Sequence, residues 1–116
     1  MSRILAQTSW TPCQSGFDAF AALSGDDNPI HTNPDYAAQH PFGAPVAHGM
    51  LIWARLQSLA QAAGISPTAD VTLRFPAPAY AGERLDLRVT EEKGALSARA
   101  ARADGTLVCE ILWGGP

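Results

Sequence analysis

Hydrophobic residues repeat with the period of a helix in the middle of the chain and with the period of a strand after it. Between residues 49 and 63 they cover more than one stripe of a helix, which predicts a long helix buried on most sides. Gly64 is suited to end it. We therefore expect an α+β fold in which an antiparallel sheet wraps this helix. The strands of that sheet are predicted where hydrophobic and polar residues alternate, at 71–75, 85–89, 96–100 and 107–111.

Turn signals separate these strands without leaving room for a linker. Residues 91–94 indicate one hairpin, and Asp104-Gly105 is a strong signal for a two-residue hairpin loop. No internal repeat or low-complexity tract interrupts the pattern, and 116 residues suffice for one core. We expect a single domain that spans residues 1–116.

The N-terminal part of the chain predicts a strand followed by a helix. Residues 4–10 suit a short first strand, and the helix after it ends at Gly25. Two starting points remain open, because Thr11 (followed by proline) and Ser15 are each suitable N-terminal caps.

Charge and cysteine content narrow the class of protein. The net charge is −3 and the eight basic residues are scattered, which argues against a nucleic-acid surface. Cys13 and Cys109 lie far apart and lack the spacing of metal ligands, so we expect reduced, partly buried thiols. No metal site is predicted.

The sequence shows neither a targeting segment nor a cofactor-binding motif. The N-terminal residues turn polar at Gln7, before a secretory hydrophobic segment develops, and no run of eighteen hydrophobic residues occurs. We therefore expect a cytoplasmic protein with no membrane partner. Neither a dinucleotide-binding glycine motif nor a phosphate-binding loop is found, so no cofactor is implied.

An acid and an imidazole lie five residues apart after the first helix. Asn28-Pro29 disfavours helical backbone between Asp26 and His31, so both side chains are expected on an irregular turn that aims them inward. Further along, Gly49 opens the long helix, where backbone N–H groups have no partner within the helix and attract an anion or a carbonyl oxygen. This combination is typical of an acid/base site.

A longer motif surrounds these residues. It comprises Phe20, Leu23, Ser24, Gly25, Asp26, Asn28, Pro29, Ile30 and His31, with Ala37 as a small residue further on. Together with the His48-Gly49-Met50 run, it resembles the signature of the MaoC-like (R)-specific enoyl-thioester hydratases, the hydratase 2 family. The resemblance extends more weakly through the C-terminal strands and covers nearly the whole chain.

The resemblance implies a hot-dog fold and the (R)-specific hydration of trans-2-enoyl thioesters, or the reverse dehydration of 3-hydroxyacyl thioesters. It implies that Asp26 and His31 hold and activate the water, and that the Gly49 N–H stabilises the enolate oxygen. Asn28 is a candidate for orienting the water or the aspartate. Which member of the Asp26–His31 pair acts as base and which as acid stays open.

The resemblance also implies a homodimer and a thioester substrate carried by coenzyme A or by an acyl carrier protein. Small or medium acyl chains are expected, because little of the chain is available for a lid. The candidate substrate-binding residues are Ser24, Phe42, His48, Met50 and Trp53, although His48 also suits a structural role before the helix. Candidate partners for the coenzyme phosphates are Arg74, Arg84, Arg88 and Arg99.

Two other functions are compatible with such a fold. A hot-dog acyl-thioesterase commonly carries an acid on the long helix, but residues 49–64 contain none. A non-catalytic acyl-CoA-binding module would not need the Asp26–His31 pair. Both features favour the hydratase interpretation.

Overall fold

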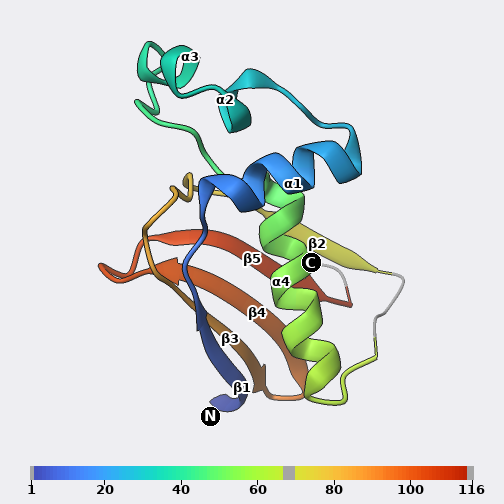
Figure 1. Cartoon of the computed structure of the whole chain (residues 1–116). Coiled ribbons are helices and arrows are strands. Elements are labelled where there is room, and N and C mark those ends of the chain that lie inside the picture. Colours follow the sequence, from blue (N-terminus) through green and yellow to red (C-terminus); the bar gives the residue numbers. More distant parts are fainter. Residues whose placement is uncertain (1, 67–69, 115–116) are drawn as a thin grey trace.

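The computed structural model describes residues 2–66 and 70–114, so the ends of the predicted domain, 1 and 116, lie outside the described residues. Figure 1 shows a strand, four helices and four further strands in chain order. Their bounds are β1 (Ser2–Trp10), α1 (Gln14–Ser24), α2 (Pro29–Thr32), α3 (Pro34–Ala38), α4 (Gly49–Ala62), β2 (Val71–Arg74), β3 (Leu85–Glu92), β4 (Ala95–Arg102) and β5 (Leu107–Trp113).

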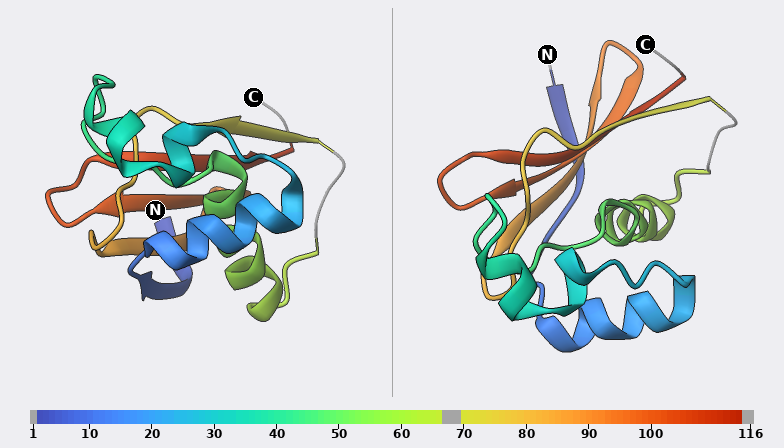
Figure 2. Two further views of the ribbon diagram at one scale, coloured as in Figure 1. Left: turned by 45° about the horizontal axis from the view of Figure 1, so that its top comes forward. Right: turned by 90° about the horizontal axis from the view of Figure 1, so that it is seen from above.

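The strands form one antiparallel sheet in the order β1-β3-β4-β5-β2. α4 lies against one face of this sheet, and α1 crosses α4 on the side away from the sheet (Figures 1 and 2). Side chains that alternate along the strands meet those of α4 in the core, among them Leu87, Val89, Ile111 and Leu56. The predicted α+β arrangement of one long helix on an antiparallel sheet is therefore confirmed.

Both predicted hairpins are present. Lys93 and Gly94 have φ values of 52° and 79°, as a two-residue loop between β3 and β4 requires. The loop between β4 and β5 is longer than predicted, because the Arg102 N–H donates to the Thr106 carbonyl and encloses three residues. Gly105, at φ 90°, supplies the left-handed residue of this three-residue loop.

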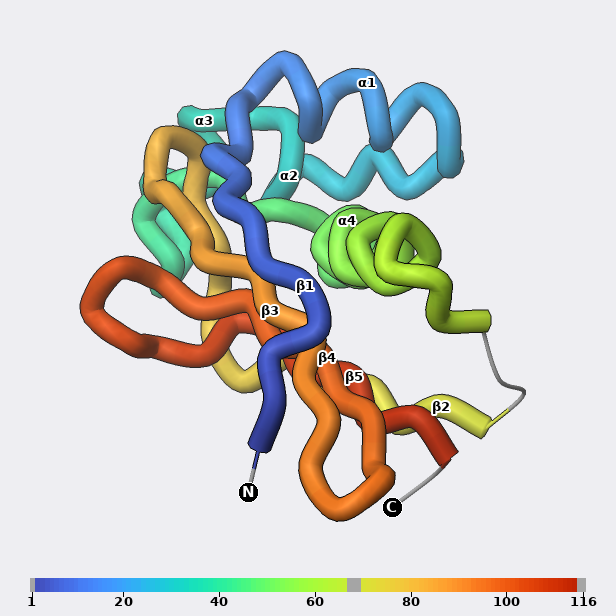
Figure 3. The backbone as a smooth tube through the Cα atoms, turned by 90° about the horizontal axis from the view of Figure 1, so that it is seen from below, coloured from blue at the N-terminus to red at the C-terminus, as the bar shows by residue number. Residues whose placement is uncertain are grey.

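The prediction that α4 is buried on most sides is wrong. Its buried residues, Ile52, Leu56, Gln57 and Ala60, form one stripe, whereas Met50 in the first turn and Ser58, Gln61 and Ala62 in the last turns are exposed. The sheet covers one face of α4, and α1 crosses only the beginning of the helix, so the last turns are covered on one side alone (Figures 1 and 3).

α1 begins at a residue that sequence reasoning did not propose. Cys13 is its N-cap and makes no side-chain cap, so neither Thr11 nor Ser15 fills that role. The Pro12 carbonyl accepts a hydrogen bond from Gly82 N–H, which keeps Pro12 outside the helix. The predicted end at Gly25 is confirmed by its φ of 80°. Within the described part of the chain, no helix combines the length and apolar character needed to cross a membrane.

Candidate active site

Asp26 lies directly after the end of α1, in the loop that leads to α2. Gly25 turns the chain with a left-handed conformation, and its N–H donates to the Ala21 carbonyl. The Asp26 N–H donates to Ser24 Oγ over 3.1 Å. The carboxylate is thus presented by a loop whose backbone is hydrogen-bonded, while its side chain is 56% exposed.

His31 lies on α2, a single helical turn that the sequence interpretation placed on an irregular segment. Asn28 caps this turn, its Oδ1 accepting from the Ile30 N–H over 3.0 Å, and Pro29 occupies the first helical position. From α1, Gln14 Nε2 donates to the His31 carbonyl over 2.8 Å. The Asn28 cap fixes the turn that carries His31, and the Gln14 bond fixes the His31 carbonyl.

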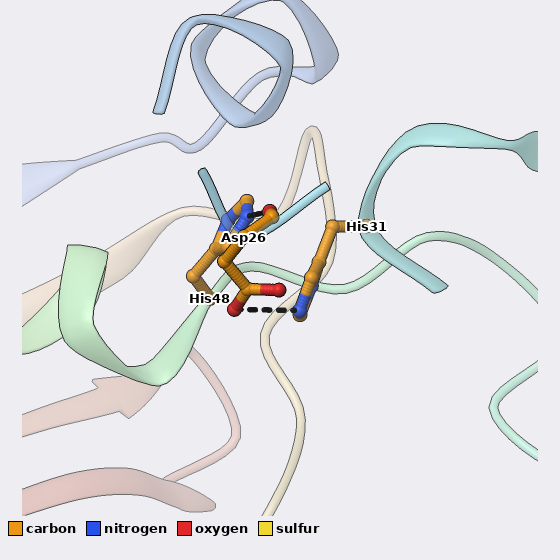
Figure 4. A group of neighbouring side chains, drawn as sticks. All are labelled: Asp26, His31 and His48. Atoms are coloured by element: carbon orange, nitrogen blue, oxygen red, sulfur yellow. Dashed lines mark hydrogen bonds and ion pairs between the residues drawn. The ribbon is translucent and has the colours of Figure 1, made fainter. Parts of the chain in front are cut away.

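The hydrogen bonds of His31 determine which ring nitrogen faces the acid. Nδ1 lies 2.8 Å from the Val46 carbonyl oxygen, which can only accept, so Nδ1 carries the proton. Nε2 therefore points to Asp26, with 3.8 Å between Nε2 and Oδ2 (Figure 4). The His31 side chain is 14% exposed. This pair is a partly solvent-accessible acid/base arrangement with a defined tautomer.

A second imidazole lies beside the first. His48 is buried, its Nε2 lies 2.9 Å from the backbone oxygen of Asp26, and its ring stacks on that of His31 with 3.8 Å between centroids (Figure 4). One ligand atom from each of Asp26, His31 and His48 lies within 4.8 Å of the others. The two ring planes differ by only 21°, however, so their nitrogen lone pairs do not converge on one point. The geometry favours an acid/base site over a metal centre.

Gly49 begins α4 next to His48. As the first residue of the helix its N–H lacks an intrahelical partner, and the positive end of the helix dipole lies there. Gly49 also lines a pocket of about 250 Å³, together with Phe42, Ile52, Phe75 and Val108. The pocket is mostly apolar, and Val46, whose carbonyl binds His31, belongs to its wall.

One of the five predicted substrate-binding residues lines this pocket. Phe42 is part of the lining, whereas Ser24, His48, Met50 and Trp53 are not among the lining residues. The Ser24 hydroxyl donates to the Phe20 carbonyl and accepts from Asp26 N–H, so its bonding is local.

The candidate arginines lie mainly on the sheet. Arg74 and Arg99 both pair with Glu110, at 3.4 and 2.8 Å, and Arg88 pairs with Asp86 at 2.7 Å. Arg88, Arg99, Glu110 and Arg74 are cross-strand neighbours, and they alternate with core residues such as Val89 and Ile111. Three of the four arginines are therefore engaged with acids on the sheet face opposite α4.

Sequence reasoning missed three residues of the site: Val46, Gln14 and Phe75. Val46 accepts from the His31 ring through its backbone carbonyl, and the Gln14 side chain donates to the backbone carbonyl of His31. Each contact involves a backbone atom, which leaves no trace in a residue pattern. Phe75 was assigned only to a strand, yet its ring packs against Gly49. Its place at the end of the predicted strand, directly before Pro76, was the one available signal that it leaves the sheet.

Comparison with known proteins identifies a family. The model of the MaoC like domain matches residues 3–107. The 3-hydroxybutyryl-CoA dehydratase of Methylorubrum extorquens is 32% identical over 95 residues, which cover 79% of this chain and 59% of that protein. The (R)-specific enoyl-CoA hydratase of Aeromonas caviae is 35% identical over 100 residues, covering 84% of this chain and 72% of the hydratase. The chain thus spans about three-fifths of the length of the first relative.

Solved structures agree with these matches. The (R)-hydratase from A. caviae involved in PHA biosynthesis superposes with a TM-score of 0.78 and 27% identity, over 97% of this chain and 91% of that one. The unliganded R-hydratase from Pseudomonas aeruginosa gives a TM-score of 0.75 and 28% identity, over 97% and 76% of the two chains. The hot-dog fold expected from the sequence is therefore confirmed.

Proposed function

Because the chain belongs to the MaoC-like domain family, we propose that it catalyses the (R)-specific hydration of trans-2-enoyl thioesters or the reverse dehydration of 3-hydroxyacyl thioesters. The observation that carries the proposal is the pairing of His31 Nε2 with the Asp26 carboxylate beside the N-terminus of α4. Relatives named as dehydratases and hydratases of such thioesters support it.

Hydration requires a base for the attacking water and a proton for C2 of the substrate. His31 Nε2 is the ring nitrogen that exchanges protons, because Nδ1 is bound to the Val46 carbonyl. One water can contact both Nε2 and Asp26 Oδ2, which are 3.8 Å apart. Between them the two groups remove a proton from this water as its oxygen attacks C3 and pass a proton on to C2, so the water supplies both the new hydroxyl group and the C2 hydrogen. Positioned groups of this kind contribute about 10²- to 10⁴-fold in rate.

Negative charge develops on the thioester oxygen as water adds to C3. In the proposed mechanism the Gly49 N–H donates to this oxygen, reinforced by the α4 dipole. Loss of such a donor costs about 3 kcal/mol in the transition state. Asn28 contributes by capping α2, and therefore by holding His31, since its Oδ1 is bound to the Ile30 N–H. The mechanism uses only groups of this chain.

The acyl chain is assigned to the pocket beside Gly49. Phe42 and Phe75 are 40% and 43% exposed and line it, and Ile52 and Val108 are buried residues of its wall. Such a small apolar space suits a short acyl group. The thioester is carried by coenzyme A or by an acyl carrier protein.

We also expect a homodimer. β1 and β2 are the edges of the sheet, and an edge strand exposes unpaired backbone groups that a second copy can cover. β2 begins with Val71, which is 38% exposed, and leads to Phe75 at the pocket. Pairing at this edge would place a second copy next to the proposed acyl site.

The test is the loss of the enoyl-thioester absorbance of crotonyl-CoA, followed by chiral analysis of the product. The wild type should form the (R)-3-hydroxyacyl thioester, and Asp26→Asn should reduce turnover by at least about 10²-fold. Asp27→Asn, which removes the neighbouring exposed acid, is the matched control and should stay active. Release of free coenzyme A thiol in place of hydration would identify a thioesterase and refute the proposal.

A further inference from the structure

His48 is the most enclosed polar residue near the proposed catalytic pair. It is 2% exposed and precedes the first residue of α4. Two rings contact its own: it stacks on His31, with 3.8 Å between centroids and 21° between planes, and the Phe20 ring approaches it at 4.9 Å and 60°. The ring therefore has little surface left for a substrate.

The hydrogen bond of His48 acts on the backbone of Asp26. The carbonyl oxygen of Asp26 can only accept, so His48 Nε2 carries a proton and donates it over 2.9 Å. On its other side, the Asp26 N–H is held by Ser24 Oγ. Asp26 lies in a loop, and these two bonds restrain the peptide groups on both sides of it. Figure 4 shows the bond from His48. The restrained backbone limits the directions that the carboxylate can take.

The stacking contact acts on His31. Its ring is bound at one edge, where Nδ1 donates to the Val46 carbonyl, and this bond alone permits the ring to rock about the N–H···O axis. The parallel face of His48 removes that freedom. A single side chain thus contacts both members of the pair, the acid through its backbone and the imidazole through its face.

We propose that His48 is a positioning residue of the reaction: it joins the loop of Asp26 to the ring of His31 and sets the geometry between Nε2 and Oδ2. This rests on the function proposed above. His48 touches neither the acyl pocket nor the reacting atoms, so its loss should lower kcat and leave KM nearly unchanged. Misplacement of catalytic groups by about 1 Å can cost on the order of 10²-fold in rate.

Two substitutions separate the contacts. His48→Phe keeps a ring for the stack and removes the donor to Asp26, whereas His48→Gln keeps an N–H donor at a comparable distance from the backbone and removes the ring. With crotonyl-CoA, kcat should fall by roughly 10²-fold in His48→Phe and by roughly ten-fold in His48→Gln, with KM within about two-fold of the wild type in both. Unchanged kcat in a folded variant, or a loss that lies entirely in KM, would overturn the proposal.

A second readout does not depend on turnover. Long-range ¹H–¹⁵N spectra should show His31 protonated at Nδ1 in the wild type and in His48→Gln, and ¹³C relaxation should show that the His31 ring is more mobile in His48→Gln. Unchanged motion of the His31 ring in that variant would overturn the proposal. If His48→Phe fails to fold, His48→Gln decides the matter by both readouts. If the wild type itself lacks turnover, the proposed reaction fails, and the relaxation measurement still decides whether His48 orders His31.

Discussion

The ring of Phe75 lies directly against the α-carbon of Gly49: a β-carbon placed on Gly49 would come within 3.0 Å of Phe75 Cε1. This distance is shorter than ordinary van der Waals contact, so a side chain at position 49 would push the partly exposed Phe75 ring aside. The contact links the proposed oxyanion donor to the mouth of the acyl pocket.

Gly49→Ala should therefore reduce kcat/KM by at least about ten-fold, because the methyl group displaces the Phe75 ring or tilts the N–H away from the substrate oxygen. Addition of Phe75→Ala removes the clash and should restore part of the lost activity. Steady-state kinetics of the two single variants and the double variant give the coupling free energy between positions 49 and 75. Wild-type activity in Gly49→Ala would contradict this account of the donor.

Phe75 should also limit the length of the acyl chain. Phe75→Ala opens one wall of the pocket, so the ratio of kcat/KM for octenoyl-CoA to that for crotonyl-CoA should rise by roughly ten-fold or more. Leu23→Ala is a suitable control, since Leu23 is 84% exposed and is not part of this pocket. An unchanged ratio would place the acyl chain elsewhere.

The proximity of Asp26 and His31 was predictable from local sequence, whereas the contacts that orient them join distant segments. Spacing and turn residues singled out Asp26, His31 and the start of the long helix at Gly49, and the resemblance supplied the roles proposed for them. The tautomer of His31 depends on the carbonyl of Val46, and the orientation of Asp26 on the ring of His48. Neither contact follows from a periodicity, since each arises from how the loop after α1 meets the segment before α4.

In the fold, too, local patterns were readable from the sequence, whereas burial that depends on distant segments was not. Alternating residues predicted the C-terminal strands well, because half-buried strands leave a period of two. The exposure of α4 was mispredicted, since hydrophobic residues such as Met50 were assumed to be covered. Gln57 is buried within the α4 stripe, although its polarity gave no sign of this.

The two cysteines should differ in reactivity. A hydrogen bond from the Ser15 hydroxyl and one from the Gly16 N–H lower the pKa of the exposed Cys13 thiol, whereas burial raises the pKa of Cys109 to about 12. The thiolate is the reactive form, so a lowered pKa increases its population at pH 8 and a raised pKa decreases it. Intact-mass analysis after iodoacetamide at pH 8 should show one adduct in the native protein and two in urea. Cys13→Ser should show none before unfolding, and an adduct there would contradict the burial of Cys109.

Glu110 should contribute to stability through its two arginines. Its side chain is 7% exposed and lies between Arg99 and Arg74, while both arginines retain contact with water. Glu110→Gln should lower the free energy of unfolding by about 1 kcal/mol, measured in urea. Asp86→Asn, which removes an exposed pairing with Arg88, should cost less. Equal losses would show that burial of Glu110 adds nothing to its ion pairs.

Sedimentation velocity tests the expected homodimer. The chain has a mass of 12.2 kDa, and the main species at micromolar concentration should have twice that mass. Val71→Pro, which removes a backbone donor that faces away from β5 on edge strand β2, should shift the population toward the monomer. A wild-type species that remains monomeric would refute the expectation.

The pairing of β1 with β3 has a consequence for how the chain acquires its site during synthesis. Trp10 pairs with Leu85, so all four helices lie in the loop that this pairing closes. A ribosome must release β3 before β1 has any partner, and until then α4 has no sheet to cover its hydrophobic stripe. The segments that carry Asp26, His31 and His48 consequently have no scaffold in a nascent chain, and a truncation before β3 should leave them without a defined arrangement.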